Sequence, residues 1–222
     1  MPELHTRLLA DVIALGAPYP LVLTGGYAIR AHRLVERPSQ DLDVATENPA
    51  PMADIAAYLQ CRPGSARLAG AVVGDRAVVG PLHRLRPGRR AGVRGRHPQG
   101  EFSRPIVQSP HGPVLAEEDV IGTKVRALGD RGAPRDLIDV FAASQRWTTA
   151  DLEEFGRRHA RGRFEQEDLQ ANLAGAEWTD DEAFTAYGID ETTISALRAW
   201  AVAWSDDLAA RLHEQPDDAH DD

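Results

Sequence analysis

Apolar residues recur at two different spacings through the first 60 residues of the chain. Residues 3–15 place apolar side chains on one face of a helix, whereas residues 39–46 alternate polar and apolar as a strand does. Between them, the apolar run "PLVLT" ends at a glycine pair that a second helical stretch follows. The predicted order is helix, strand, helix, strand and helix, over residues 3–15, 20–24, 27–35, 39–46 and 51–60.

The second half of the chain has helical spacing almost throughout. Helices are predicted over 116–129 and 134–144, and residues 149–213 are helical by pattern. Thr179 and Glu182 have the spacing of a capping box, which predicts a helix start. A stripe of apolar residues marks a long final helix, namely Ile194, Leu197, Ala201, Trp204, Leu208 and Leu212.

Composition narrows the class of protein. At 222 residues the chain can bury one full core and a small helical appendage, and its only cysteine, Cys61, excludes an internal disulfide or a thiolate metal cluster. No apolar run reaches the roughly 18 residues of a membrane span, and the N-terminus lacks a signal-peptide layout. We therefore expect a soluble, cytoplasmic protein. Its formal net charge of −9 argues mildly against a dedicated duplex-DNA binder.

Charge is distributed unevenly along the chain. Residues 61–100 contain nine arginines and only one acidic residue, Asp75, in a chain that is acidic overall. The chain also has a single lysine, Lys124, among many arginines. A compact ammonium suits a triphosphate differently from a guanidinium, which favours a functional role for Lys124 over a solvated surface charge.

A glycine pair and a carboxylate pair lie close together in the sequence. Asp41 and Asp43 alternate on a predicted strand, so they share one face with about 7 Å between their Cα atoms and could jointly hold Mg²⁺. Gly25 and Gly26 stand between a strand and a helix, where backbone N–H groups can approach a triphosphate. Either motif alone is usually a solvated strand edge or a simple turn, but the two at this spacing indicate one site.

These motifs resemble those of the polymerase-β-like nucleotidyltransferase superfamily. "GGYAIRAHRLVERPSQDLDV" followed by "DVIGTKVRALGDRGAPRDLIDV" is similar, within it, to the AbiEii class of abortive-infection toxins. The resemblance covers about residues 1–145 apart from the basic segment. The residues at family positions are Ser39, Asp41, Asp43, Lys124, Arg135, Asp136 and Asp139.

The resemblance implies a fold and a reaction. It implies an α/β (α+β) nucleotidyltransferase core with a small mixed sheet flanked by helices over 1–145, a helical region over 146–213 and a disordered acidic tail over 214–222. It further implies Mg²⁺-dependent transfer of a nucleotide from a nucleoside triphosphate to RNA, such as the 3′ end of tRNA, and a cognate antitoxin protein as partner.

The resemblance also assigns roles to single residues. Asp41 and Asp43 would hold the metal, Lys124 would pair with the triphosphate, and Asp136 would position Lys124 or the metal shell. Ser39 would place its hydroxyl at the catalytic centre. Each later residue has a structural alternative: Asp136 suits a helix start, and Ser39 suits a strand entry.

One element of the family pattern is missing. A third carboxylate is expected on a strand before Lys124, but residues 79–102 show no strand periodicity and no acid before Glu101. Permitted codons for "GVRGRHPQGE", read one nucleotide later, encode Glu-Cys-Glu-Val-Asp-Ile-Leu-Lys-Glu, with the aspartate at Arg96 and His97. We therefore predict that residues 61–100 are irregular and translated out of frame, and that this exact chain is inactive or nearly so.

Two alternatives remain open at this point. The first motif also occurs in nucleotidyltransferases that modify small molecules such as antibiotics. A non-catalytic remnant that still binds nucleotide or an antitoxin is the other alternative.

Overall fold

The computed structural model describes most of the chain, and the chain forms two compact units. These units are Met1–Val120 and Ile121–Asp222, and each is considered by itself below. The predicted functional boundary near residue 145 stays a prediction, and the predicted acidic tail lies beyond residue 214, outside the described residues. The described residues are 3–37, 39, 41–61, 72–73, 77–78, 93–96, 102–159 and 164–214.

The first unit is built on a five-stranded mixed sheet. Its strands lie in the order β5-β2-β1-β7-β6. The central strand β1 pairs antiparallel with β2 and parallel with β7, while β2 pairs parallel with β5 and β6 pairs antiparallel with β7. The predicted small mixed sheet is therefore confirmed. The strand bounds are β1 Val22–Thr24, β2 Leu42–Ala45, β5 Val93–Arg96, β6 Val107–Ser109 and β7 Gly112–Val114.

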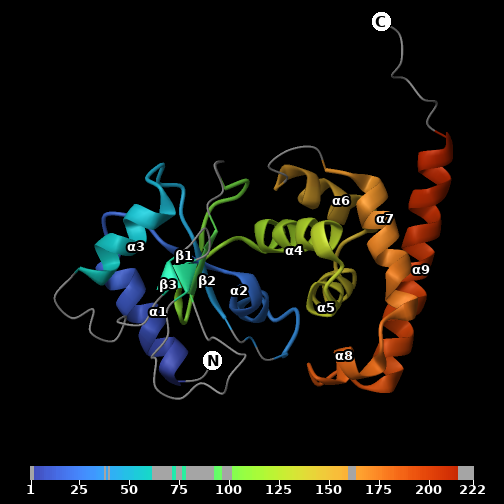
Figure 1. Cartoon of the computed structure of the whole chain (residues 1–222), viewed down its shortest axis with the longest axis horizontal. Helices are drawn as coiled ribbons and strands as arrows, with labels where there is room; N and C mark the ends of the chain where they lie inside the picture. Colours follow the sequence, from blue (N-terminus) through green and yellow to red (C-terminus); the bar gives the residue numbers. More distant parts are fainter. Residues whose placement is uncertain are drawn as a thin grey trace, which may run out of the picture. The chain divides into compact units, whose positions relative to one another are not determined.

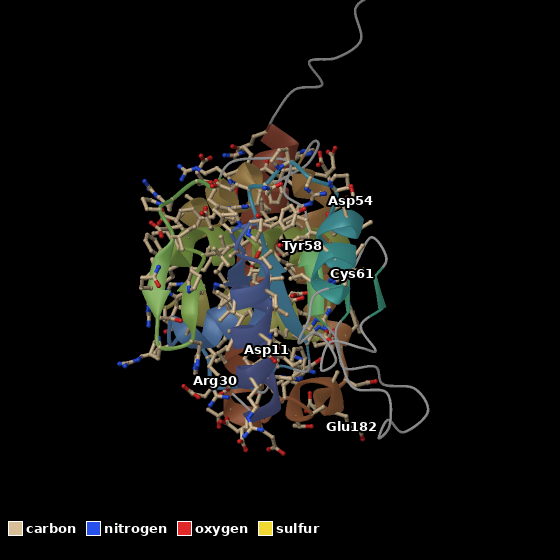
Figure 2. All side chains as sticks on the ribbon, turned by 90° about the vertical axis from the view of Figure 1, so that its left-hand side faces the viewer. Asp11, Arg30, Asp54, Tyr58, Cys61 and Glu182 are labelled. Atoms are coloured by element: carbon tan, nitrogen blue, oxygen red, sulfur yellow. The ribbon has the colours of Figure 1, made fainter. Side chains whose placement is uncertain are left out.

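Helices cover both faces of this sheet. Figures 1 and 2 show α1 (Glu3–Leu15) and α3 (Met52–Gln60) on one side of the strands, and Figure 1 shows α2 (Gly25–Ala31) on the other. Apolar residues of all three helices join those of the strands in one buried core, as the 3.6-residue and two-residue spacings require. The core includes Leu9, Val12, Leu23, Ile29, Val44 and Ile55.

The basic segment is not wholly irregular, which corrects the expectation from sequence. It contributes a two-stranded sheet of β3 (Val72–Val73) and β4 (Ala77–Val78), as well as β5 at the edge of the main sheet. A short edge strand is held by backbone hydrogen bonds to one neighbour, so it can form without the alternation on which the prediction relied. The out-of-frame hypothesis itself stays a prediction.

The second unit is helical, as predicted. Its helices are α4 Glu117–Arg131, α5 Pro134–Ala143, α6 Thr149–Arg158, α7 Gln166–Ala174, η2 Gly175–Trp178, α8 Asp181–Thr185 and α9 Glu191–Glu214, with α4 beginning four residues before the unit boundary. Five of the six residues in the predicted stripe on α9 are buried. No helix within the described ranges is long and apolar enough to cross a membrane.

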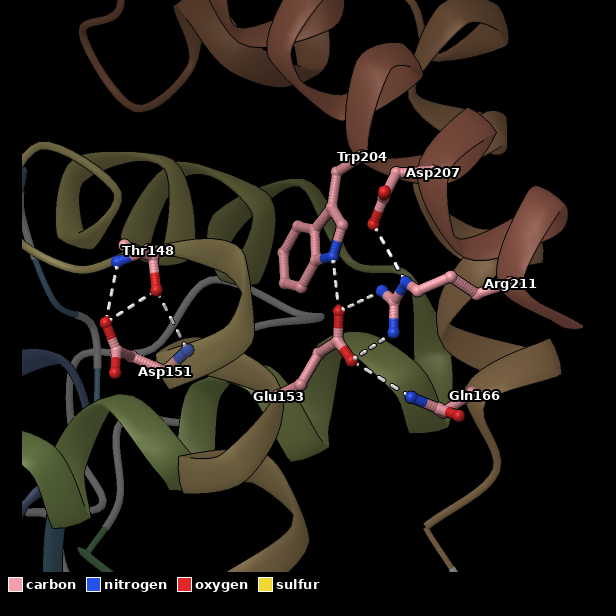
Figure 3. A network of polar contacts seen from close by, with 7 residues as sticks. All are labelled: Thr148, Asp151, Glu153, Gln166, Trp204, Asp207 and Arg211. Carbon is pink, nitrogen blue, oxygen red and sulfur yellow. Dashed lines mark hydrogen bonds and ion pairs between the residues drawn. The ribbon is translucent and has the colours of Figure 1, made fainter.

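The predicted capping box at Thr179 is wrong. The Thr179 hydroxyl donates backwards to the carbonyl of Gly175, and α8 begins after Asp180 without a side-chain cap. The box occurs instead at the start of α6, where Thr148 and Asp151 satisfy each other's backbone N–H groups (Figure 3). A short acidic side chain at the third position fills the role that the pattern reserves for Glu or Gln.

Candidate active site

The glycine pair opens α2 directly at the end of β1. Gly25 has a φ of +65°, in the left-handed region that favours glycine. A methyl group at this position would come within 2.1 Å of Oδ2 of Asp43, because Thr24 at the end of β1 is the register partner of Asp43 on β2. Only a residue without a side chain lets the backbone and the carboxylate come this close.

Gly26 makes a second close approach to the same segment. A methyl group on Gly26 would lie 2.6 Å from the Ser39 hydroxyl oxygen and 3.5 Å from Nη2 of Arg37. The Ser39 hydroxyl donates to the carbonyl of Asp41 at 3.0 Å. The structure therefore brings together Gly25, Gly26, Ser39 and Asp43, which sequence reasoning assigned to one site.

The carboxylate pair has the chemistry that Mg²⁺ requires, with a small difference from the predicted geometry. Asp43 lies on β2, but the strand begins at Leu42, so Asp41 occupies the bend just before it. Both side chains are half-buried. Two carboxylates fit a hard cation that takes its remaining ligands from water and phosphate. The described residues hold no cluster of three or more His, Cys, Asp or Glu suited to a metal.

The strand expected to carry a third carboxylate is present, but the acid is not. β5 runs parallel to β2, and the Cα of Arg94 is the register partner of Asp43, while Arg96 is that of Ala45. His97 and Glu101, whose side chains could in principle bind a metal in place of the missing carboxylate, lie outside the described residues. A guanidinium is not a metal ligand, so neither arginine position replaces a carboxylate.

Two residues that sequence reasoning missed support the segment that carries Ser39 and Asp41. The Tyr27 hydroxyl donates to the Ser39 carbonyl at 3.1 Å, and Nδ1 of His5 is hydrogen-bonded to the same hydroxyl. Burial lowers the pKa of His5, an effect that Asp41 partly opposes. Burial also raises the pKa of Tyr27, and Asp41 adds to that effect while Arg30 counters it.

A second group of predicted residues lies in the helical unit. Nζ of Lys124, on α4, is 3.3 Å from Oδ1 of Asp136 and 2.8 Å from Oδ2 of Asp139, both on α5. Arg131 binds the other oxygen of Asp136 through Nε at 2.8 Å and Nη2 at 2.5 Å. Asp136 and Asp139 are fully buried, and Lys124 is 8% exposed. We call Lys124, Arg131, Asp136 and Asp139 the lysine cluster.

Opposing effects set the pKa of Asp136. Burial, the largest single influence, raises it by disfavouring the charged form. The positive charges of Lys124 and Arg131, together with the Arg131 hydrogen bond, outweigh burial, so the pKa of Asp136 falls below its ordinary value. The carboxylate is therefore ionised at neutral pH and holds the Lys124 ammonium in place.

The structure thus groups the predicted residues in two places. The glycine pair, Ser39 and the carboxylate pair belong to the first unit, and the lysine cluster belongs to the second. Sequence reasoning missed Arg131, although it stands at the end of the helix of Lys124 and five residues before Asp136. It also missed His5 and Tyr27. The position of Tyr27 directly after the glycine pair could have drawn attention to it, whereas no sequence signal pointed to His5.

Comparison with known proteins identifies the family of the chain, while the roles of the single residues stay predictions. Residues 96–222, more than half of the chain, match the family described as the nucleotidyl transferase AbiEii toxin of type IV toxin–antitoxin systems. The match includes the lysine cluster but not the glycine and carboxylate pairs. No curated protein matches the sequence.

Solved structures extend the likeness of fold over almost the whole chain. MenT4, a nucleotidyltransferase toxin from Mycobacterium tuberculosis H37Rv, has a TM-score of 0.55 at 19% identity and covers 94% of this chain and 86% of its own. A crystal structure assigned to the nucleotidyltransferases of H. pylori has a TM-score of 0.52 at 14% identity, with 95% of each chain covered. The chain belongs to the AbiEii nucleotidyl transferase toxin family of type IV toxin–antitoxin systems and is a nucleotidyltransferase.

Proposed function

We propose that this protein is a cytoplasmic toxin that transfers a nucleoside monophosphate from a nucleoside triphosphate to RNA, with the 3′ end of tRNA as the first candidate acceptor. The acceptor hydroxyl would attack the α-phosphorus, and pyrophosphate would leave. The observation that carries the proposal is the close approach of Gly25 to Asp43, which a methyl group would abolish at 2.1 Å. It supports a site where phosphate-binding backbone and metal-binding carboxylates adjoin.

Each group at this site has a part in binding or transfer. Asp41 and Asp43 would hold Mg²⁺, which when bound neutralises phosphate charge and polarises the reacting oxygens. Backbone N–H groups at Gly25 and Gly26 would donate to phosphate oxygens. Ser39 would keep Asp41 in place through the hydrogen bond to its carbonyl.

Lys124 would pair with the triphosphate while it remains in the lysine cluster. An ammonium has three N–H donors, and Asp136 and Asp139 are two acceptors. A phosphate oxygen can be the third. Asp136 would then act by positioning Lys124, the first of the two roles considered from sequence.

The acceptor is tested by offering alternatives side by side. A chain in which the reading frame of residues 61–100 has been repaired is incubated with each of the four labelled nucleoside triphosphates, with or without Mg²⁺, and with either total tRNA or aminoglycosides. Label on tRNA that requires Mg²⁺ supports the proposal. Label on the aminoglycoside alone would show a small-molecule nucleotidyltransferase, and nucleotide binding without any transfer would show a non-catalytic remnant.

Activity depends further on the missing third carboxylate. Two carboxylates leave a two-metal site incomplete, so we expect this exact chain to bind nucleotide weakly with Mg²⁺ and to transfer little or none. A chain with the reading frame of residues 61–100 repaired is expected to transfer, and Asp41→Ala in the repaired chain is expected to abolish transfer. Equal turnover by both chains would show that the third carboxylate is unnecessary. Sequencing the coding DNA tests the frame directly.

A further inference from the structure

Tyr27 connects the glycine pair to the segment that carries Asp41. It lies in the first turn of α2, two residues after Gly25, and is only 2% exposed. Its hydroxyl donates to the backbone carbonyl of Ser39 at 3.1 Å. The Ser39 hydroxyl in turn donates to the Asp41 carbonyl at 3.0 Å. Two consecutive hydrogen bonds therefore run from α2 to the bend that precedes β2.

The hydrogen-bond count fixes the role of His5. A tyrosine hydroxyl has one hydrogen, and here the Ser39 carbonyl accepts it. Nδ1 of His5, which contacts the same hydroxyl, is therefore assigned as the donor. The two rings also meet edge to face, with centroids 5.4 Å apart and an interplanar angle of 82°.

The three connected residues come from separate parts of the fold. His5 lies on α1, Tyr27 lies on α2, and Ser39 lies in the segment between α2 and β2. β2 begins at Leu42, so none of the described residues of that segment belongs to a strand. Asp43 is held by the β1–β2 ladder. The position of Asp41, which precedes that ladder, therefore depends more on side-chain contacts than the position of Asp43 does.

We infer that Tyr27 and His5 are positioning residues that hold Ser39 and the bend at Asp41 so that the Asp41 carboxylate is aligned for a divalent cation. The inference rests on the proposed function, in which Asp41 is a metal ligand. Tyr27 and His5 touch neither metal nor nucleotide in this account. They act by removing conformational freedom from a ligand-bearing bend before binding, which strengthens binding without adding a contact.

A purely packing role makes a different prediction. The Tyr27 ring is buried in the core with Ala28 and Ile29, and Tyr27→Phe keeps that ring while it removes the hydroxyl. If only packing matters, the variant binds metal as the unaltered chain does. If the hydroxyl holds the bend, metal affinity falls in a protein that is still folded.

The experiment measures Mn²⁺ binding to the full chain by electron paramagnetic resonance, since Mn²⁺ prefers the same oxygen ligands as Mg²⁺. The dissociation constant for Mn²⁺ is determined alone and with each of the four nucleoside triphosphates. Tyr27→Phe is expected to raise it about fivefold, the effect of one lost hydrogen bond. Tyr19→Phe, the same change at a partly buried tyrosine elsewhere in the first unit, serves as the control and is expected to leave the dissociation constant unchanged.

A second pair of variants separates this inference from the proposed function. Asp41→Ala tests the metal ligand itself, and Tyr27→Phe added to Asp41→Ala is expected to have no further effect on Mn²⁺ affinity. A clear effect of Asp41→Ala with none of Tyr27→Phe would overturn the positioning role alone. No effect of Asp41→Ala would overturn the metal assignment and this inference together. Thermal unfolding of each variant checks that binding is measured on folded protein.

Discussion

Lys124→Met is expected to destabilise the protein markedly, whatever its effect on nucleotide binding. The substitution keeps an unbranched side chain of similar length but removes the charge. The Lys124 side chain is 10% exposed, and the carboxylates of Asp136 and Asp139 are fully buried at 3.3 and 2.8 Å from its ammonium. Methionine would leave these buried charges with one cation fewer.

The arrangement of the cluster sets the size of the effect. Removing one partner of a buried ion pair costs about 3 to 5 kcal/mol, because a charge is left in a low-dielectric environment. Arg131 still binds Asp136 in the variant, so the loss falls mainly on Asp139. We therefore expect about 3 kcal/mol, at the lower end of the range. Asp139→Asn, added to Lys124→Met, is expected to restore a large part of it by removing the charge that Lys124 compensated.

The assay is urea unfolding of the full chain followed by tryptophan fluorescence. All four tryptophans belong to the second unit, at positions 147, 178, 200 and 204, so the signal reports on the unit that contains the cluster. Arg126→Met is the matched control on the same helix. Its partner Asp130 is 54% exposed, and exposed pairs contribute at most about 1 kcal/mol.

Two results would refute this reasoning. One is a Lys124→Met protein within about 1 kcal/mol of the unaltered chain, since the buried carboxylates would then not need the ammonium. The other is a double variant no more stable than Lys124→Met. A confirmed loss means that low activity of any Lys124 variant has to be corrected for unfolding before a catalytic role is assigned.

Three further predictions follow from other contacts. The pKa of Asp136 is lowered in the folded protein, so its carboxylate contributes fully to stability above its ordinary pKa of 3.8, and this contribution is lost as the pH falls through the folded-state pKa. Asp136→Asn should therefore make the free energy of unfolding depend less on pH at acid pH. Gly25→Ala should weaken Mg²⁺-nucleotide binding at least about tenfold, whereas Gly175→Ala, where a methyl meets no described atom within 4 Å, should not. Arg211→Met should cost about 1 to 2 kcal/mol in urea unfolding, because Glu153 is buried but Arg211 is partly exposed; a change below about 0.5 kcal/mol would contradict it (Figure 3).

The spacing of apolar and polar residues predicted most of the helices and strands. It failed where the backbone departs from regular helical or strand geometry. The helix predicted over 27–35 begins earlier, at Gly25, and ends at Ala31. Beyond it, Arg33 takes a φ of +55° and the N–H of Leu34 returns to the carbonyl of Ile29. Nothing in the apolar spacing marks this turn. β5 was missed because an edge strand forms through backbone hydrogen bonds to a neighbouring strand and does not require alternating polar and apolar residues.

The parts of the site that are close in sequence were predictable, and those assembled by tertiary contacts were not. Gly25 and Asp43 lie close together because β1 and β2 are adjacent antiparallel strands, with Thr24 opposite Asp43. A short stretch of sequence is therefore enough to predict that they share a site. The hydrogen bond between His5 on α1 and Tyr27 on α2 joins two residues that are 22 positions apart in the sequence. The role of Arg131 depends on how α4 and α5 pack, which residue type and spacing alone do not determine.

The close approach of Gly25 to Asp43 makes these two positions dependent on each other across related sequences. While an acid remains at 43, the space beside it admits no side chain at 25. A relative that has lost the acid is free to replace the glycine, and the positive φ then favours asparagine or aspartate over other residues. Replacement of both residues together would therefore mark a family member that has lost the metal site proposed here, and it could be recognised from sequence without any measurement of activity.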